Sequence, residues 1–101
     1  MVRSRLFENT LYVSLYGDLD EHNANTIRKE LDNLLSQGNF KQIVIDLAEL
    51  DFMDSTGIGV LIGRYKMIKD LGVSIFISNP NKQVDKIFKM TGIYSIMPKI
   101  N

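Results

Sequence analysis

The stretch Phe52–Lys66, FMDSTGIGVLIGRYK, decides the fold of this chain. Apolar residues in this stretch and in the turn that follows recur at spacings of three and four, which predicts an amphipathic helix over about residues 55–71. Three positions of the same helix are glycines, although each interior glycine costs about 1 kcal/mol relative to alanine. They are Gly57, Gly59 and Gly63. A helix that carries this cost near its start needs a structural or functional reason for it.

Strand-like segments lie on both sides of this helix. Residues 41–47 (KQIVIDL) are a short apolar run rich in β-branched residues, typical of a strand covered on both faces, and residues 73–78 (VSIFIS) are the next predicted strand. Residues 10–17 (TLYVSLYG) alternate between apolar and polar, and residues 2–8 are predicted to pair with them as a hairpin. We expect residues 48–54 to form a loop.

Two further helices are predicted from the helical periodicity. The first covers about residues 24–35, and the last is expected to begin at the pair Asn79 and Pro80 and to end at Gly92. Residues 93–100 are expected to be an edge strand or an irregular tail. This order of elements predicts an α/β fold, with helices packed on a small mixed sheet of four to five strands.

Length and composition indicate one compact domain over residues 1–101, with 45% hydrophobic and 24% charged residues. Twelve basic and twelve acidic residues balance, so no bulk attraction to nucleic acid or anionic lipid is expected. The chain shows no secretory signal and no apolar run long enough for a membrane span, which favours a cytoplasmic protein. Without cysteine it has no disulfide, thiolate metal site or thiol catalysis.

Two polar segments are expected at the carboxyl ends of the parallel strands, where such sheets bind their ligands. They are residues 17–20 (GDLD) and 48–56 (AELDFMDST). Asp54, Ser55 and Thr56 stand where the central helix begins, and their simplest role is to cap its free N–H groups. Alternatively Ser55 accepts a phosphoryl group, because the positive end of a helix favours an anion. A phosphate adds up to about two negative charges and would alter a docking surface without refolding the domain.

The glycines of the central helix also allow two interpretations. Gly59 and Gly63 are four residues apart and therefore lie on one face of the helix. Glycine permits close approach either by another part of the same fold or by a partner. The spacing alone leaves open whether this face packs internally or forms an exposed docking surface.

The motif MDSTGIGVL (53–61), preceded by IVIDL (43–47) and followed by GRYKMIKDLG (63–72), resembles the signature of bacterial anti-sigma factor antagonists of the STAS domain family. The resemblance extends to GDLD near the start and to KIFKMTGI (86–93) near the end, so it covers nearly the whole chain. It implies a STAS fold and a role in transcription regulation, most similar to the sporulation members of the family.

The resemblance implies a phosphorylation-controlled binding protein and not an enzyme. In this family the unphosphorylated antagonist binds an anti-sigma factor that is also a GHKL-type serine kinase, which frees the sigma factor, and a PP2C-type phosphatase reverses the phosphorylation. The phosphoacceptor of the family matches Ser55. The positions implied in partner binding are Asp20, Asp54, Ser55, Thr56, Gly57, Ile58 and Gly59. An interaction or scaffold module of the same family that is never phosphorylated remains the alternative.

Other chemistries match the sequence poorly, and no cofactor, metal site or catalytic residue is predicted. A nucleophile elbow needs glycine two residues before the serine, where this chain has Met53. The single histidine, His22, is expected at the start of a helix as a surface or capping residue. Asp46, Asp51 and Asp54 suggest a phospho-aspartate receiver or a loosely bound cation, but the opening hairpin argues against a receiver, and loop acids and caps are the favoured interpretation.

Overall fold

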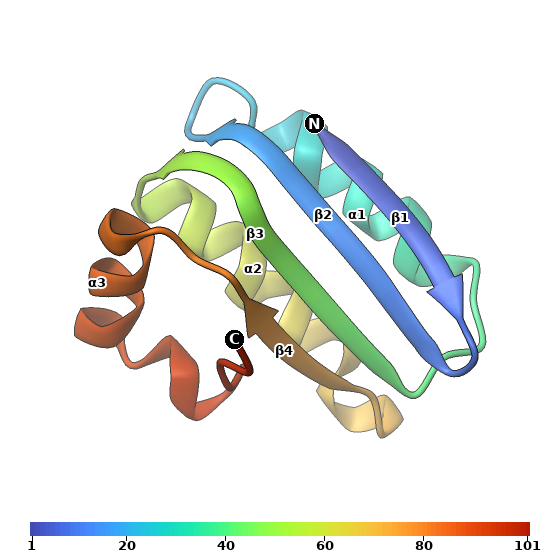
Figure 1. Ribbon diagram of the computed structural model, residues 1–101. Coiled ribbons are helices and arrows are strands. Elements are labelled where there is room, and N and C mark those ends of the chain that lie inside the picture. The colour runs from blue at the N-terminus through green and yellow to red at the C-terminus, as the bar shows by residue number, and fades with distance from the viewer.

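The computed structural model describes residues 1–101, which form one four-stranded sheet in the order β1-β2-β3-β4 (Figure 1). Strand β1 (Val2–Phe7) is antiparallel to β2 (Thr10–Leu19), while β3 (Gln42–Met53) runs parallel both to β2 and to β4 (Ser74–Ser78). The predicted mixed sheet and N-terminal hairpin are therefore confirmed.

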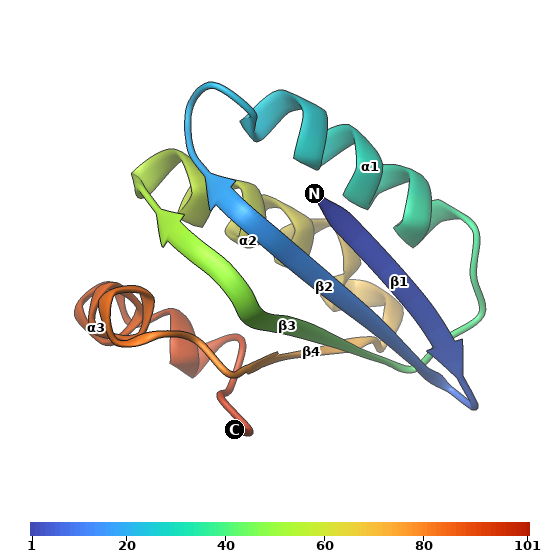
Figure 2. The ribbon, with the colours of Figure 1, turned by 45° about the horizontal axis from the view of Figure 1, so that its top comes forward.

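Two helices cover one face of this sheet and a third lies beside its edge. Helices α1 (Ala24–Ser36) and α2 (Ser55–Ile68) pack side by side on the same face, whereas α3 (Lys82–Thr91) lies near the carboxyl ends of β3 and β4 (Figure 2). Short 3-10 turns follow α2 at Lys69–Leu71 and α3 at Ile93–Ser95. No helix has the length and apolar character that a bilayer crossing requires.

The core lies between the sheet and helices α1 and α2. Alternate residues of β2 and β3 point into it, and on the helix side the apolar stripe of α2 meets them. Leu15, Ile43, Ile27 and Leu61 are all at most 2% exposed. Burial of a side chain of this size contributes about 1.5–3 kcal/mol, so the packing of α1 and α2 on one sheet face accounts for much of the stability of the fold.

The expectation of a loop over residues 48–54 was wrong, because β3 continues to Met53. The pairing of β3 with β2 shifts register twice, between Ser14 and Tyr16 and between Gly17 and Asp18 of β2. Such bulges insert an extra residue on one strand. Core residues of this part of β3 consequently recur every third position instead of every second, at Leu47, Leu50 and Met53.

The start of α3 and the tail also differ from the expectation. Asn81 is the N-cap, with its Oδ1 accepting a hydrogen bond of 2.9 Å from Val84 N, while Asn79 precedes the helix in a left-handed conformation with φ of 57°. After its 3-10 turn the tail forms a single parallel bridge between Ile77 and Lys99, and so adds only a short edge to the sheet.

Candidate functional site

The candidate site lies where β2 and β3 end next to each other. Leu19 and Met53 are paired in the last row of the parallel ladder, and Asp54 N donates to Leu19 O at 3.3 Å. Helix α2 then begins at Ser55. The two polar segments expected at the carboxyl edge are thus brought together, as Figure 1 shows at the upper ends of β2 and β3.

Asp54 joins two elements through one carboxylate. Its Oδ1 accepts a hydrogen bond of 3.0 Å from Gly57 N, which caps α2, and its Oδ2 accepts one of 3.3 Å from Glu21 N, in the segment that leads into α1. The backbone of Asp54 is extended, as an N-cap requires. The predicted cap is confirmed, and the bond to Glu21 adds a link to α1 that the sequence did not reveal.

Asp20 organises the turn before α1. Its Oδ1 accepts hydrogen bonds from His22 N at 2.9 Å and from Asn23 N at 3.3 Å, and Asn23 Oδ1 accepts one from Asp20 N at 3.0 Å. The next residue, Glu21, carries the N–H group that binds Asp54. Asp20 therefore supports the segment that contacts the start of α2, and its carboxylate is only partly buried.

Ser55 and Thr56 are exposed as the first two residues of α2. Backbone N–H groups in the first turn have no acceptor within a helix, and the helix dipole adds a partial positive charge there. The hydroxyl of Ser55 is exposed to solvent. An anion attached to it would lie at the positive end of the α2 dipole but next to the carboxylate of Asp54.

The three glycines of α2 divide into two kinds. A Cβ on Gly57 would lie 2.7 Å from Leu19 O, 2.7 Å from Met53 Cγ and 2.8 Å from Leu19 Cγ, so only glycine fits between the ends of β2 and β3. A Cβ on Gly59 or Gly63 would meet nothing within 4 Å. Internal packing therefore explains Gly57, whereas Gly59 and Gly63 leave an open helix face.

Two of the positions implied in partner binding are buried. Gly57 packs between the ends of β2 and β3, and Ile58 is only 7% exposed. These two residues pack against the fold and fix the start of α2, whereas Ser55, Thr56 and Gly59 face solvent. The predicted set thus separates into a supporting layer and an exposed layer.

A groove between α1 and α2 runs on from the exposed layer. Thr56 and Gly59 line it from α2, while Asn25 and Arg28 line it from α1. Sequence reasoning missed the α1 residues, since Arg28 stands on the polar side of the α1 stripe like any solvated arginine. The possible docking face at Gly59 and Gly63 was the only signal in the sequence that pointed to this surface.

The acidic residues near the site do not converge. Asp46 Oδ1 accepts from Ala48 N and Asn79 Nδ2, and Asp54 is used as a cap. Asp51 is exposed. No three His, Cys, Asp or Glu side chains are arranged to hold a metal ion. Asp54 is therefore a helix cap, whereas Asp46 and Asp51 lie on β3.

Comparison with known proteins agrees with this geometry. The STAS domain model matches residues 2–101. An anti-sigma F factor antagonist from Paenibacillus polymyxa is 38% identical over 88 residues, which are 87% of this chain and 75% of that protein. An anti-sigma-B factor antagonist from Bacillus subtilis is 34% identical over 90 residues, covering 89% and 81% of the two chains.

Solved structures of the anti-sigma factor antagonist SpoIIAA are also similar. The unphosphorylated form gives a TM-score of 0.82 at 26% identity, covering all of this chain and 89% of that one. The phosphorylated form gives 0.74 at 25% identity, with 100% and 92% covered. The chain belongs to the STAS domain family, and the resemblance drawn from its sequence is confirmed. The proteins from Paenibacillus polymyxa and Bacillus subtilis and unphosphorylated SpoIIAA are described as anti-sigma factor antagonists. Phosphorylated SpoIIAA is described as a cell fate determinant.

Proposed function

We propose that this protein is an anti-sigma factor antagonist that binds its anti-sigma factor in the unphosphorylated form and thereby releases a sigma factor. The observation that carries the proposal is the exposed Ser55 at the first position of α2. It follows Asp54, whose carboxylate accepts hydrogen bonds from Gly57 N and Glu21 N, and it lies on the helix that leaves open space at Gly59. The identity of about a third to the antagonists from Paenibacillus polymyxa and Bacillus subtilis supports it.

Phosphorylation of Ser55 inactivates the protein through charge. A phosphate carries close to two negative charges at neutral pH and lies one residue from the Asp54 carboxylate. The helix dipole stabilises such an anion by about 0.3–1 kcal/mol, whereas two like charges 4 Å apart repel by about 1 kcal/mol in water and about 4 kcal/mol near a protein surface. An interface that closes over both groups raises their repulsion from about 1 toward about 4 kcal/mol, and this increase of up to about 3 kcal/mol weakens the complex by up to about a hundredfold.

The partner is a GHKL-type serine kinase that acts as the anti-sigma factor. A kinase must place the γ-phosphate of ATP against Ser55, so the surface that binds the partner also presents the serine for transfer. Once Ser55 is phosphorylated, its negative charge would be repelled by the phosphates of the nucleotide bound to the kinase. A PP2C-type phosphatase restores the binding form, and all of these reactions take place in the cytoplasm.

The partner-binding surface consists of the exposed layer, Asp20, Asp54, Ser55, Thr56 and Gly59. Gly57 and Ile58 act beneath it by fixing the first turn of α2. The protein is a regulator and not an enzyme. His22, the residue most suited to base catalysis, is exposed in the turn before α1.

The first sigma factor to test is the sporulation factor. The antagonist of the anti-sigma F factor from Paenibacillus polymyxa is 38% identical to this chain, compared with 34% for the antagonist of the anti-sigma-B factor from Bacillus subtilis. Release of each sigma factor in a reconstituted transcription assay distinguishes the two pathways.

Intact mass and site mapping test the switch, after incubation with ATP and the kinase encoded beside this protein. The expected product carries one phosphate on Ser55, which is absent from Ser55→Ala and still present in Thr56→Ala. A stable complex without phosphate would instead support the unphosphorylated scaffold module. Failure to bind any anti-sigma factor would overturn the proposed function.

A further inference from the structure

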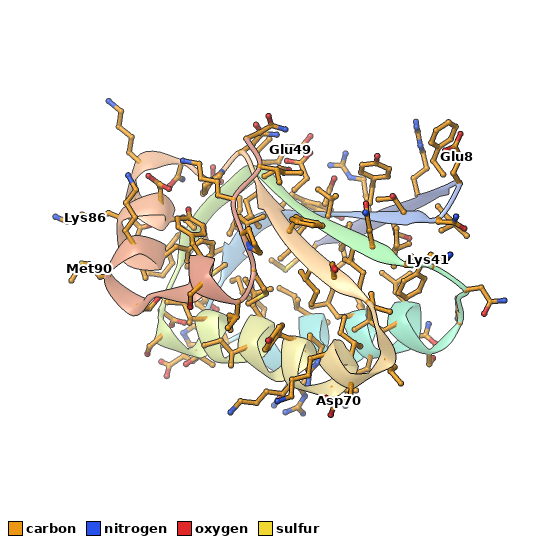
Figure 3. The ribbon with its side chains drawn as sticks, turned by 90° about the horizontal axis from the view of Figure 1, so that it is seen from below. Glu8, Lys41, Glu49, Asp70, Lys86 and Met90 are labelled. Carbon is orange, nitrogen blue, oxygen red and sulfur yellow. The ribbon has the colours of Figure 1, made fainter.

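The sheet has a second face that no helix covers. Helices α1 and α2 both lie on the side that carries Asp70, while no helix lies over the strands on the opposite side, which carries Glu49 (Figure 3). We call this side the open face and define it by the outward-pointing residues Arg5, Tyr12, Val44, Asp46 and Phe76.

Strand pairing arranges these residues in a regular grid. Arg5, Tyr12, Val44 and Phe76 stand opposite one another on β1, β2, β3 and β4, so they form one row across the sheet. Tyr12 is 41% exposed. Val44 is only 8% exposed and Phe76 is partly buried, so Tyr12 is the most accessible apolar side chain of this row, and Arg5 places a cation at its β1 end.

The charges of the open face are only partly neutralised within the chain. Arg3 on β1 pairs with Glu49 at 2.8 Å. Arg5 has no carboxylate partner, and its guanidinium lies 5.5 Å from the centre of the Phe7 ring. Asp46, two strands away, has no basic partner and accepts hydrogen bonds only from an amide N–H and an asparagine side chain. The open face thus presents one unpaired positive and one unpaired negative group.

We propose that the open face binds a second copy of this chain around a two-fold axis that runs along the strands between β2 and β3. This axis lays β1 of each copy over β4 of the other, and β2 over β3, so the same contacts occur twice. Tyr12 then packs on the second copy's Val44. Arg5 lies over the second copy's Phe76, in cation–π contact, with Asp46 on the adjoining strand.

The charges select this axis over the alternative. An axis across the strands would place β1 on β1, and the two copies of Arg5 would meet each other. Packed sheets lie about 10 Å apart with strands within about 30° of parallel, a separation that a tyrosine and an arginine side chain can fill. The chosen axis is the one that pairs opposite charges.

The size of the open face sets the strength of this dimer. Four strands about 4.8 Å apart and three outward rows about 6.7 Å apart cover roughly 20 by 20 Å. This is about 400 Å² for each copy, half of the roughly 800 Å² that a standard interface buries on each side. The dimer is therefore weak and reversible. Its formation leaves the carboxyl edge with Ser55 accessible and does not depend on the proposed function.

Sedimentation equilibrium from 10 μM to 1 mM at low salt tests the dimer. Tyr12→Glu is expected to weaken association about tenfold or more, whereas Met90→Glu, at an exposed position on α3, is a matched control that leaves it unchanged. Arg5→Glu and Asp46→Lys each weaken it, and the double variant recovers most of the loss because the pair is restored with reversed sign. Thermal unfolding of each variant verifies that it is folded.

Concentration-dependent NMR shifts locate the contact independently. Changes confined to Tyr12, Val44, Phe76 and their neighbours support the inference. A chain that remains monomeric at 1 mM, a dimer that tolerates Tyr12→Glu, or charge reversals that the double variant does not rescue would overturn it.

Discussion

Gly57→Ala is expected to destabilise the fold, whereas Gly59→Ala in the same helix is expected to stabilise it. The added methyl group at position 57 would stand 2.7 Å from a backbone oxygen, Leu19 O, and 2.7 Å from Met53 Cγ. The side chain of Met53 can move, but the carbonyl of Leu19 belongs to the last paired row of the sheet. The strain at this position therefore cannot be relieved by a side-chain rotation alone.

The net effect follows from two opposing contributions. Overpacking of a close contact costs about 1–3 kcal/mol, and alanine in place of helical glycine returns up to about 1 kcal/mol. Gly57→Ala should therefore lower the free energy of unfolding by about 1–2 kcal/mol. Gly59→Ala and Gly63→Ala, where the methyl group meets nothing, should raise it by about 0.5–1 kcal/mol.

Urea denaturation followed by circular dichroism measures this difference, with the m-value used to check that the unfolding transition is unchanged. A difference of about 2 kcal/mol between Gly57→Ala and Gly59→Ala corresponds to roughly 8–16 °C in Tm for a domain of this size. If Gly57→Ala were as stable as Gly59→Ala, the assignment of Gly57 to internal packing would be refuted.

Four other outcomes are expected. Ser55→Ala should bind the anti-sigma factor normally and resist switching, while Ser55→Asp should bind about tenfold more weakly; equal affinities in calorimetry would contradict the electrostatic switch. Gly59→Leu should impair binding while its Tm stays close to that of Gly59→Ala, and a parallel loss of both would point to internal packing instead. Asp54→Ala removes a cap and the link to Glu21, so it should lower stability by about 1–2 kcal/mol in urea. The Tyr94 hydroxyl, with Lys99 and Lys89, holds the pKa of Asp85 well below its ordinary value. The ionised carboxylate therefore stabilises the fold above its unfolded pKa near 4, and this contribution is lost as pH falls toward the folded pKa. The Tm of Asp85→Asn should therefore drop less steeply in acid than the Tm of the wild type.

Most elements of this fold were predictable because burial and local periodicity coincide in them. In residues 10–17 every second side chain is apolar and faces α1 or α2, and in α2 the three-four spacing marks its buried stripe. Residues 48–53 were misassigned because burial and local periodicity do not coincide there. Their core positions follow a period of three, which is set by the bulged pairing with β2 and not by any local preference of the segment.

The site was predictable where its chemistry is local. Asp54 and Ser55 were placed at a helix start from their own sequence context, and the cap confirms it. The bond from Glu21 N to Asp54 spans 33 positions, and the groove that Arg28 shares with Gly59 depends on how α1 packs against α2. Equally, the sequence could not separate Gly57 from Gly59, since they differ only in what lies opposite them in space.

These contacts suggest how the proposed phosphorylation of Ser55 would act on binding without refolding the protein. Gly57 is held against Leu19 O, and the Asp54 carboxylate is fixed by N–H groups on both sides, from Gly57 and from Glu21. Neither can move far to reduce repulsion from a charge placed on Ser55. Under the proposal, such a charge would remain at the surface that contacts the partner, and its cost would fall on the complex and not on the fold. A more pliable helix start would have absorbed the same charge by relaxing, which would have weakened the switch.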